Sequence, residues 1–200
     1  MNTPIRHQSV RHRFADRLFH WGMAACVILL GATAFLPILG YRFDWVPLHW
    51  TAGVALALFV LFHLFRVFFI HGVWEMVPRG DDIREIGRAT RGAGREALSE
   101  AKYDAFQKGF HLTAATTVLV LLATGLIMLA KIDTTFWRRD PSILTDYTWG
   151  IIYVIHAAAA LVLLFLFILH VYFALLPEHR SFLSAMISGQ GPEKARKGNS

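Results

Sequence analysis

Two histidines interrupt the longest apolar run of the chain, and their spacing indicates the chemistry to look for. His156 and His170 stand in the otherwise apolar stretch 151–175, fourteen residues apart. Fourteen residues are close to four helical turns, so both imidazoles would lie on one face of a helix, about 21 Å apart along its axis. An imidazole left unsatisfied at membrane depth costs several kcal/mol. Two imidazoles on one helix face therefore predict two binding partners, which lie at different depths in the membrane.

A b-type haem is a partner that meets this demand. Its iron needs a neutral imidazole nitrogen on each axial side to become a six-coordinate electron carrier. The macrocycle also needs small residues beside the ligand, and Gly53 stands one turn after His49, while Gly22 stands two residues after His20. A single histidine is more simply read as a hydrogen bond between helices, but four at matched depths favour ligation. The sequence therefore predicts two haem b groups stacked along the membrane normal.

The composition is typical of a membrane protein. The chain has 200 residues, 55% of them hydrophobic, and a mean hydropathy of +0.44. Its single cysteine, Cys26, excludes an intrachain disulfide and a Cys-x-x-Cys-His haem attachment. The net charge of +6 does not indicate nucleic-acid binding, because Lys and Arg collect in the cytoplasmic loops of membrane proteins. We find no internal repeat and no low-complexity tract.

Four apolar runs predict an all-α membrane protein, a bundle of four transmembrane helices. Each run is long enough to cross a bilayer as a helix. The predicted helices cover about residues 18–39, 47–70, 110–130 and 149–176. They form a membrane domain over residues 18–176 that contains a loop at 71–108. Polar segments at 1–17 and 177–200 flank this domain.

The basic residues orient the predicted bundle. Segments 1–17, 72–108 and 177–200 hold 15 of the 20 Lys and Arg residues, whereas the other two connections hold four. Basic residues concentrate in the cytoplasmic segments of membrane proteins. The sequence therefore predicts that both termini and the large loop are cytoplasmic, in a multi-pass protein of the bacterial inner membrane.

This orientation converts sequence positions into depths. His49 and His156 are level near the outer face, which makes one predicted haem pair. His170 lies near the inner face, roughly level with both His20 and His63. Spacing alone does not choose between these two partners, because His49 and His63 are fourteen residues apart, just as His156 and His170 are.

Four stretches carry a family resemblance that spans nearly the whole chain. They are Arg13-Phe-Ala-Asp-Arg-Leu-Phe-His-Trp21, Leu48-His-x-x-x-Gly53 through Phe65-Arg66, Tyr103-Asp-Ala-Phe-Gln-Lys108, and Ile155-His-Ala-Ala-Ala through His170-Val-Tyr172. These stretches resemble the cytochrome b subunit of membrane-bound formate dehydrogenases, in the wider family of dihaem b-type cytochromes of hydrogenases and related respiratory enzymes.

The resemblance implies which histidines are ligands. In that family the positions matching His49 and His156 hold the outer haem. The positions matching His20 and His170 hold the inner haem, which favours His20 over His63. His63 remains the alternative ligand of the inner iron.

The resemblance also implies a quinone site beside the inner haem. Hydrogen-bond donors and a proton relay are expected there, and the candidates are Tyr103, Asp104, Gln107, Lys108 and His111. Asp104 and Phe106 differ from the Asn and Gly usual in the family, which affects the contacts to the quinone headgroup. Arg17 and Arg66, near the inner face, are candidates for pairing with haem propionates or for snorkelling to the interface.

The predicted function is electron transfer from a membrane-anchored iron–sulfur subunit to membrane quinone. Substrate oxidation would lie in a separate molybdenum or tungsten subunit, because this chain lacks a cysteine cluster and a phosphate-binding loop. No catalytic residue is expected here, and the complex is a candidate for higher oligomerisation.

Four alternatives remain open on the sequence alone. Two of them are also cytochromes: the cytochrome b subunit of a NiFe hydrogenase and that of a molybdoenzyme other than formate dehydrogenase. A histidine-relay transporter or proton channel would need carboxylates at depth, and the four apolar runs contain none. A passive anchor for a peripheral enzyme would leave the histidines unexplained.

Overall fold

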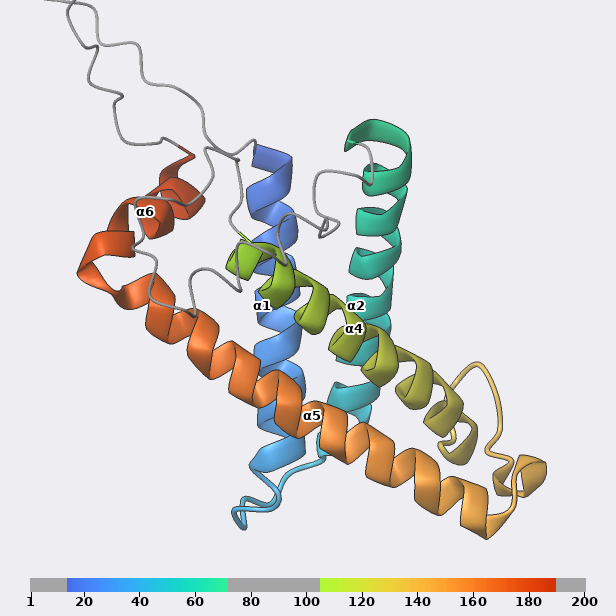
Figure 1. Ribbon diagram of the computed structural model, residues 1–200. Coiled ribbons are helices and arrows are strands. Elements are labelled where there is room, and N and C mark those ends of the chain that lie inside the picture. The colour runs from blue at the N-terminus through green and yellow to red at the C-terminus, as the bar shows by residue number, and fades with distance from the viewer. Residues whose placement is uncertain (1–13, 72–104, 190–200) are drawn as a thin grey trace, which may run out of the picture. The chain divides into compact units, whose positions relative to one another are not determined.

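The computed structural model describes residues 14–71 and 105–189, and over these residues it is all-helical (Figure 1). The helices are α1 (Phe14–Phe35), α2 (Trp45–Arg66), α4 (Ala105–Met128), α5 (Asp146–Leu175) and the short α6 (Arg180–Ser188). The first four are long and apolar enough to cross a membrane. They confirm the predicted number of spans. Most of the predicted loop 71–108 lies outside the described residues.

Many large side chains of these helices point outward, as in a helix that faces lipid. Phe69 is 77% exposed, Val154 69% and Leu58 63%. Soluble monomers rarely display so much contiguous apolar surface. The exposed apolar surface and the length of the helices together indicate a multi-pass membrane protein.

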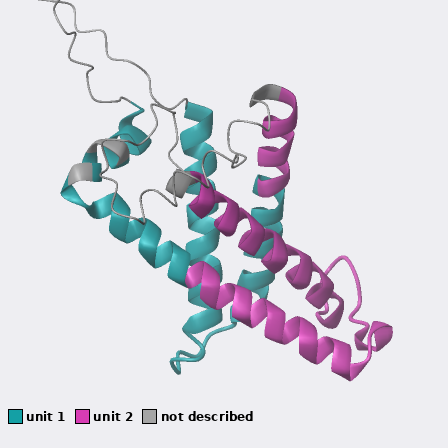
Figure 2. Ribbon diagram, in the orientation of Figure 1, with its two compact units in different colours: residues 1–59, 165–200 teal, residues 60–164 magenta. Residues whose placement is uncertain are grey.

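The chain divides into two compact units (Figure 2). Unit 1 comprises residues 1–59 and 165–200, and unit 2 comprises residues 60–164. The boundary passes through α2 and α5, so each of these helices contributes residues to both units.

Helix α1 ends where its sequence stops supporting a helix. It was predicted to extend to residue 39 but ends at Phe35. Pro37 lacks the N–H that continues a helical ladder. Gly40 then adopts a left-handed φ of 94°, which an L side chain would rarely tolerate. The chain turns here and begins α2 at Trp45.

In unit 1, the start of α1 is held by the end of α6. The Trp21 indole N–H donates to the Met186 carbonyl at 3.2 Å, and Arg17 Nε donates to the same carbonyl at 3.3 Å. A terminal N–H of Arg17 donates to the Ile187 carbonyl. These carbonyls belong to the last turn of α6, the negative end of its dipole. Helix α6 was not predicted and lies in the segment expected to be a polar tail.

In unit 2, the connection between α4 and α5 is anchored on an aromatic residue. Trp149 is 1% exposed and donates its indole N–H to the Pro141 carbonyl at 2.9 Å. Lys131 Nζ lies 4.7 Å from the centroid of the same indole ring, within the range of a cation–π contact. Asp140 accepts hydrogen bonds from the hydroxyl and backbone N–H of Ser142, and these bonds hold the pKa of Asp140 below its usual value.

Helix α5 begins at a capping residue. Thr145 Oγ1 accepts a hydrogen bond from the Thr148 N–H at 3.3 Å, in the position of an N-cap. Asp146 lies in the first turn, where a negative charge is favoured by the helix dipole. These residues start the helix three positions before the predicted residue 149. The helix then places His156 and His170 in one continuous element.

Candidate histidine ligands and their partners

Unit 1 brings His20 of α1 against His170 of α5. Their ring centroids are 6.1 Å apart, with an angle of 50° between the ring planes. A metal–imidazole bond is about 2.0–2.1 Å and the nitrogen lies about 1.1 Å from the ring centre, so two imidazoles on opposite sides of one metal have centroids about 6.3 Å apart. The separation of these two rings therefore fits axial ligation of a single iron.

Unit 1 also holds His49 in place through a threonine of the neighbouring helix. Thr33 Oγ1 of α1 lies 2.8 Å from His49 Nδ1 of α2. Thr33 is only 1% exposed, and its hydroxyl also lies 2.8 Å from the Leu29 carbonyl one turn earlier. The ring of His49 is thereby fixed by a buried neutral hydroxyl.

Unit 2 repeats this arrangement around His156. Thr124 Oγ1 of α4 lies 2.8 Å from His156 Nδ1 of α5 and 2.7 Å from the Val120 carbonyl. Thr124 is 8% exposed. A Cβ at Gly125 would lie 3.4 Å from His156 Cε1, so a glycine at this position lets the imidazole approach α4 closely.

The hydroxyl proton of each threonine decides which nitrogen of the histidine remains available. A threonine hydroxyl has one proton to donate, and each of these hydroxyls donates it to the carbonyl four residues earlier. With its proton on that carbonyl, each oxygen is an acceptor for the histidine Nδ1–H of the Nδ1-protonated tautomer. This tautomer leaves the lone pair on Nε2, the nitrogen that a metal would need.

Sequence reasoning missed Thr33, Thr124 and Gly125. A threonine inside a helix commonly bonds to its own i−4 carbonyl, so its presence alone did not indicate a second partner. The available signal was position, because each threonine lies in an apolar run where few side chains can accept a hydrogen bond.

Unit 2 also brings His63 of α2 against His111 of α4. The ring centroids are 6.4 Å apart, with an angle of 58° between the planes. His63 was the alternative ligand of the inner iron, and His111 was a quinone candidate. The structure gives each of them the other as a neighbour, at a separation that also fits two imidazoles on one metal.

Each unit therefore has two histidine contacts at different heights along its helices. One is a contact between two imidazoles, and the other is a hydrogen bond between a histidine and a threonine. His20 and Thr33 are thirteen residues apart on α1, and His111 and Thr124 are thirteen residues apart on α4. Thirteen helical residues span about 20 Å. The two levels are thus separated by most of the thickness of a bilayer hydrocarbon core.

The remaining candidates have other surroundings. Arg17 is engaged by α6 carbonyls, and the Arg66 guanidinium carbon lies 5.9 Å from the centroid of the Phe62 ring. Phe59 fills the space that Gly22 was expected to leave open, since a Cβ at Gly22 would lie 2.5 Å from Phe59 Cζ. A Cβ at Gly53 would meet nothing within 4 Å.

The proposed quinone segment is only partly described. Tyr103, Asp104 and the side chain of Gln107 lie outside the described part of the chain. Lys108 and His111 fall in the first two turns of α4, which begins at Ala105. The described portion of this segment therefore supplies two of the five candidates.

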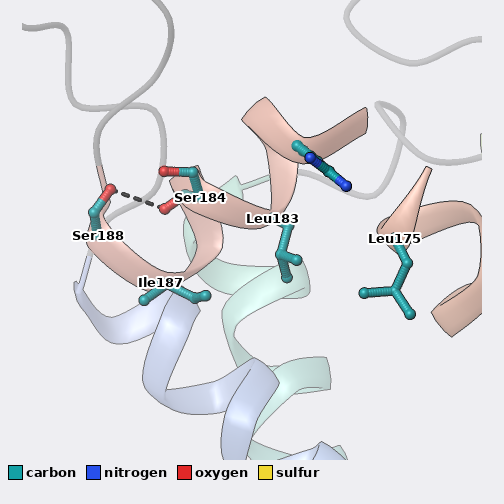
Figure 3. Close-up of a pocket in the computed structure, with 6 residues that line it drawn as sticks. Leu175, Leu183, Ser184, Ile187 and Ser188 are labelled. Carbon is teal, nitrogen blue, oxygen red and sulfur yellow. Dashed lines mark hydrogen bonds between the residues drawn. The ribbon is translucent and has the colours of Figure 1, made fainter. Parts of the chain in front are cut away.

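The donor set suits a macrocycle better than a bare ion. Residues 14–71 and 105–189 contain no cluster of three or more His, Cys, Asp or Glu residues. A bare zinc-like ion takes three or four protein ligands, whereas a haem iron needs only two beyond its porphyrin. A hollow beside α6 (Figure 3) contains none of the predicted ligands, being lined by Leu175, Arg180, Leu183, Ser184, Ile187 and Ser188.

Comparison with known proteins gives these histidines a family context. Residues 11–189 match the family described as prokaryotic cytochrome b561. The chain belongs to this family. Membership implies that haem b is its cofactor, in agreement with the paired imidazoles.

Relatives of known function confirm the resemblance to formate dehydrogenase cytochromes. The chain is 28% identical over 182 residues to the cytochrome b556(Fdn) subunit of the nitrate-inducible formate dehydrogenase of Escherichia coli K12. The same subunit from Escherichia coli O157:H7 and from Shigella flexneri matches equally. The match covers 82% of this chain and 76% of the relative. This cytochrome b561-type membrane protein is thus related to the cytochrome b subunits of formate dehydrogenases.

The two threonines yield a direct prediction about ligand orientation. Replacing Thr33 or Thr124 by valine keeps the shape but leaves the histidine Nδ1–H without its acceptor. We expect Thr33→Val and Thr124→Val each to weaken haem binding at the predicted outer site by about 10- to 100-fold, the usual effect of losing such a partner. Titration of haem into the haem-depleted chain measures this change.

Serine provides the matched control for each substitution. Thr33→Ser and Thr124→Ser keep the hydroxyl, so haem affinity should stay close to that of the parent chain. Equal affinities for the valine variant and the parent chain would contradict an orienting role of the threonines.

Proposed function

We propose that this chain is a dihaem b-type cytochrome subunit that passes electrons from a partner iron–sulfur subunit to membrane quinone and anchors the complex. The observation that carries the proposal is the 6.1 Å separation of the His20 and His170 ring centroids, in a chain of a b-type cytochrome family. In such a family, imidazoles at that separation fit the two axial ligands of one haem iron. A histidine-relay transporter would also need carboxylates at depth, which the four apolar runs lack, and a passive anchor gives the imidazoles no use.

The proposed ligands are His49 and His156 for the outer haem and His20 and His170 for the inner haem. The buried hydroxyls of Thr33 and Thr124 support the outer assignment, because each presents one ligand in the Nε2-available tautomer. Haem b supplies one-electron transfer when it is bound at these residues.

Quinone reduction needs protons as well as electrons. A quinone becomes a quinol by taking up two electrons and two protons. We place this step at the start of α4, within the segment Tyr103 to His111, where Lys108 can donate a hydrogen bond to a quinone carbonyl. Protons taken from the cytoplasm would make inward electron flow add to the membrane potential.

The proposed arrangement of the chain is based on the distribution of its basic residues. Residues 18–176 form the membrane domain, and residues 1–17, the loop 71–108 and the tail 177–200 are cytoplasmic in the bacterial inner membrane. The formate dehydrogenase relatives support a complex with an anchored iron–sulfur subunit and a molybdenum or tungsten subunit, in which formate would be oxidised.

Removing individual histidines tests the ligand assignment. The purified chain should show a reduced-minus-oxidised spectrum of b-type haem. His49→Ala and His156→Ala should each abolish binding of the same haem, and His20→Ala and His170→Ala should each abolish binding of another. His179→Ala is the matched control, because that imidazole bonds the Phe173 carbonyl at 2.9 Å outside the proposed sites. A chain that stays colourless with ample haem supply would refute the proposal.

Quinol oxidation tests the proposed acceptor site in the reverse direction. We expect reduced quinone analogues to reduce the haem in proteoliposomes. Lys108→Ala should raise the quinol concentration needed for half-maximal reduction by about tenfold, the effect of losing one hydrogen bond of about 1.4 kcal/mol. The Lys108→Arg control keeps a donor and should show a smaller change. Rapid haem reduction by quinol at parental concentrations in Lys108→Ala would remove Lys108 from the site.

Cysteine labelling in spheroplasts tests the proposed orientation. With the buried Cys26 replaced by serine, a membrane-impermeant maleimide should label Arg42→Cys and Ser142→Cys, which lie in the two short connections. It should label Lys194→Cys only after permeabilisation. The opposite labelling pattern would invert the proposed topology.

A further inference from the structure

The two proposed ligands of the inner haem lie near opposite ends of the chain. His20 stands in the second turn of α1, and His170 stands near the end of α5. No short loop joins these two helices, so tertiary contacts must hold the two imidazoles at a fixed separation. Helix α6, the short helix that follows α5 (Figure 1), supplies such contacts to the start of α1.

The end of α6 offers backbone carbonyls to donors from other elements. Gly189 has a left-handed φ of 86° and donates its N–H to the Ala185 carbonyl at 2.8 Å. This αL cap satisfies one of the four carbonyls that the last turn of a helix leaves without an internal partner. The carbonyls of Met186 and Ile187 belong to the same turn and need donors from elsewhere.

Two side chains of α1 supply those donors. The Trp21 indole N–H lies 3.2 Å from the Met186 carbonyl, and Arg17 Nε lies 3.3 Å from it. A terminal N–H of Arg17 donates to the Ile187 carbonyl. A guanidinium is favoured at the negative end of a helix dipole. Arg17, which the sequence left as a candidate for a haem propionate, is thus engaged by α6.

The side of α6 that makes these bonds is packed. Ala185 is 0% exposed and Met186 is half-buried, whereas Ile187 is 58% exposed. The exposed side of the helix carries Leu183 and Ile187 beside the hollow seen in Figure 3. The packed side therefore holds the Met186 carbonyl at a defined place.

Trp21 contacts a proposed ligand as well as α6. The ring centroids of Trp21 and His20 are 5.2 Å apart, with an angle of 88° between the planes, an edge-on arrangement. The His20 ring also lies 6.1 Å from the His170 ring. The imidazole of His20 therefore contacts both the indole that α6 holds and the second proposed ligand.

We propose that α6 positions the inner-haem ligand His20 through Trp21, with the indole N–H as the link. This inference rests on the proposed function, which makes His20 a ligand. Trp21 is a positioning residue, because it acts on the iron only through the imidazole. The link also joins the two ligands, since α6 continues the chain from the helix that carries His170.

Hydrogen exchange in the haem-free full chain tests the link itself. Trp21→Phe keeps an aromatic ring beside His20 but removes the N–H that bonds Met186. We expect amide exchange across Arg180–Ser188 to become about threefold to tenfold faster than in the parent, the effect of losing one hydrogen bond. Ser184→Ala is the control on α6, because it changes an exposed side chain and keeps every carbonyl. Equal exchange in Trp21→Phe and the parent would overturn the link.

Haem titration and ferric electron paramagnetic resonance test the effect on the ligand. Trp21→Phe should weaken binding of the haem that is lost in His20→Gln by about tenfold, the lower end of the usual effect of losing an orienting partner. The low-spin signal of that haem should shift, because the imidazole is no longer held at one angle. The haem that is lost in His49→Gln should keep its affinity and signal, since its ligands do not contact α6.

Gly189→Val reaches the same link from α6. An L side chain is strained at a φ of 86°, so the last turn should fray and carry the Met186 carbonyl away from Trp21. The inner signal should shift as in Trp21→Phe, and the double variant should show no larger effect than either single variant. Additive effects would show that the two residues act independently and would overturn the proposal. Gly189→Ala replaces the valine variant if circular dichroism shows that the latter is unfolded.

The outcomes distinguish this inference from the proposed function. Two haems in the parent, with the inner haem unchanged in Trp21→Phe, would overturn the positioning role and leave the dihaem function standing. Equal weakening of both haems in Trp21→Phe would indicate a general loss of packing and would overturn the positioning role as well. A chain without haem in any preparation would overturn the function and, with it, this role of Trp21.

Discussion

An imidazole inside an apolar helix must find a partner, and this constraint organises the whole molecule. The four long helices are apolar enough to cross a membrane, and inside a bilayer they would have no water to hydrogen-bond their polar side chains. In the structure, two histidines of these helices hydrogen-bond a buried threonine hydroxyl, and four lie against another imidazole in two pairs. None of these contacts is needed to make a helix. They are the contacts that the proposed haem ligation would use.

Thr33 and Thr124 show how a small residue serves the helix and the ligand together. Each hydroxyl gives its proton to its own helix, which keeps the residue compatible with an apolar run. The same oxygen accepts from a histidine on the next helix and thereby selects the tautomer. A carboxylate in this place would bring an uncompensated charge into the hydrocarbon region, where it is expensive. A neutral hydroxyl orients the ring without that charge.

Bilayer thickness and hydropathy made the four spans predictable from the sequence. The spans and the expected depths of the histidines depend only on runs of apolar residues and on a helical rise of fixed size. The proximity of His20 and His170 was predicted from depth and family resemblance. Helix α6 and the bonds of Arg17 to it were not predicted, since they depend on tertiary contacts that no local pattern encodes. The neighbour of His63 was also missed, because depth alone aligned it with His170.

The hairpin α1–α2 and the hairpin α4–α5 carry polar residues at the same spacing, but the surroundings of equivalent positions differ. The equivalent residues are His20 and His111, Thr33 and Thr124, His49 and His156, and His63 and His170. Gly22, two residues after His20, accommodates the Phe59 ring, whereas the equivalent Thr113 bonds its own helix at the Gly109 carbonyl, 2.9 Å away. Arg17 is tied to the carbonyls of α6, the short helix that comes after α5. The contacts that hold histidines are thus duplicated, while the packing around them has diverged. In the proposed function, such differences in burial and nearby charge would give haems with the same kind of axial ligand different reduction potentials.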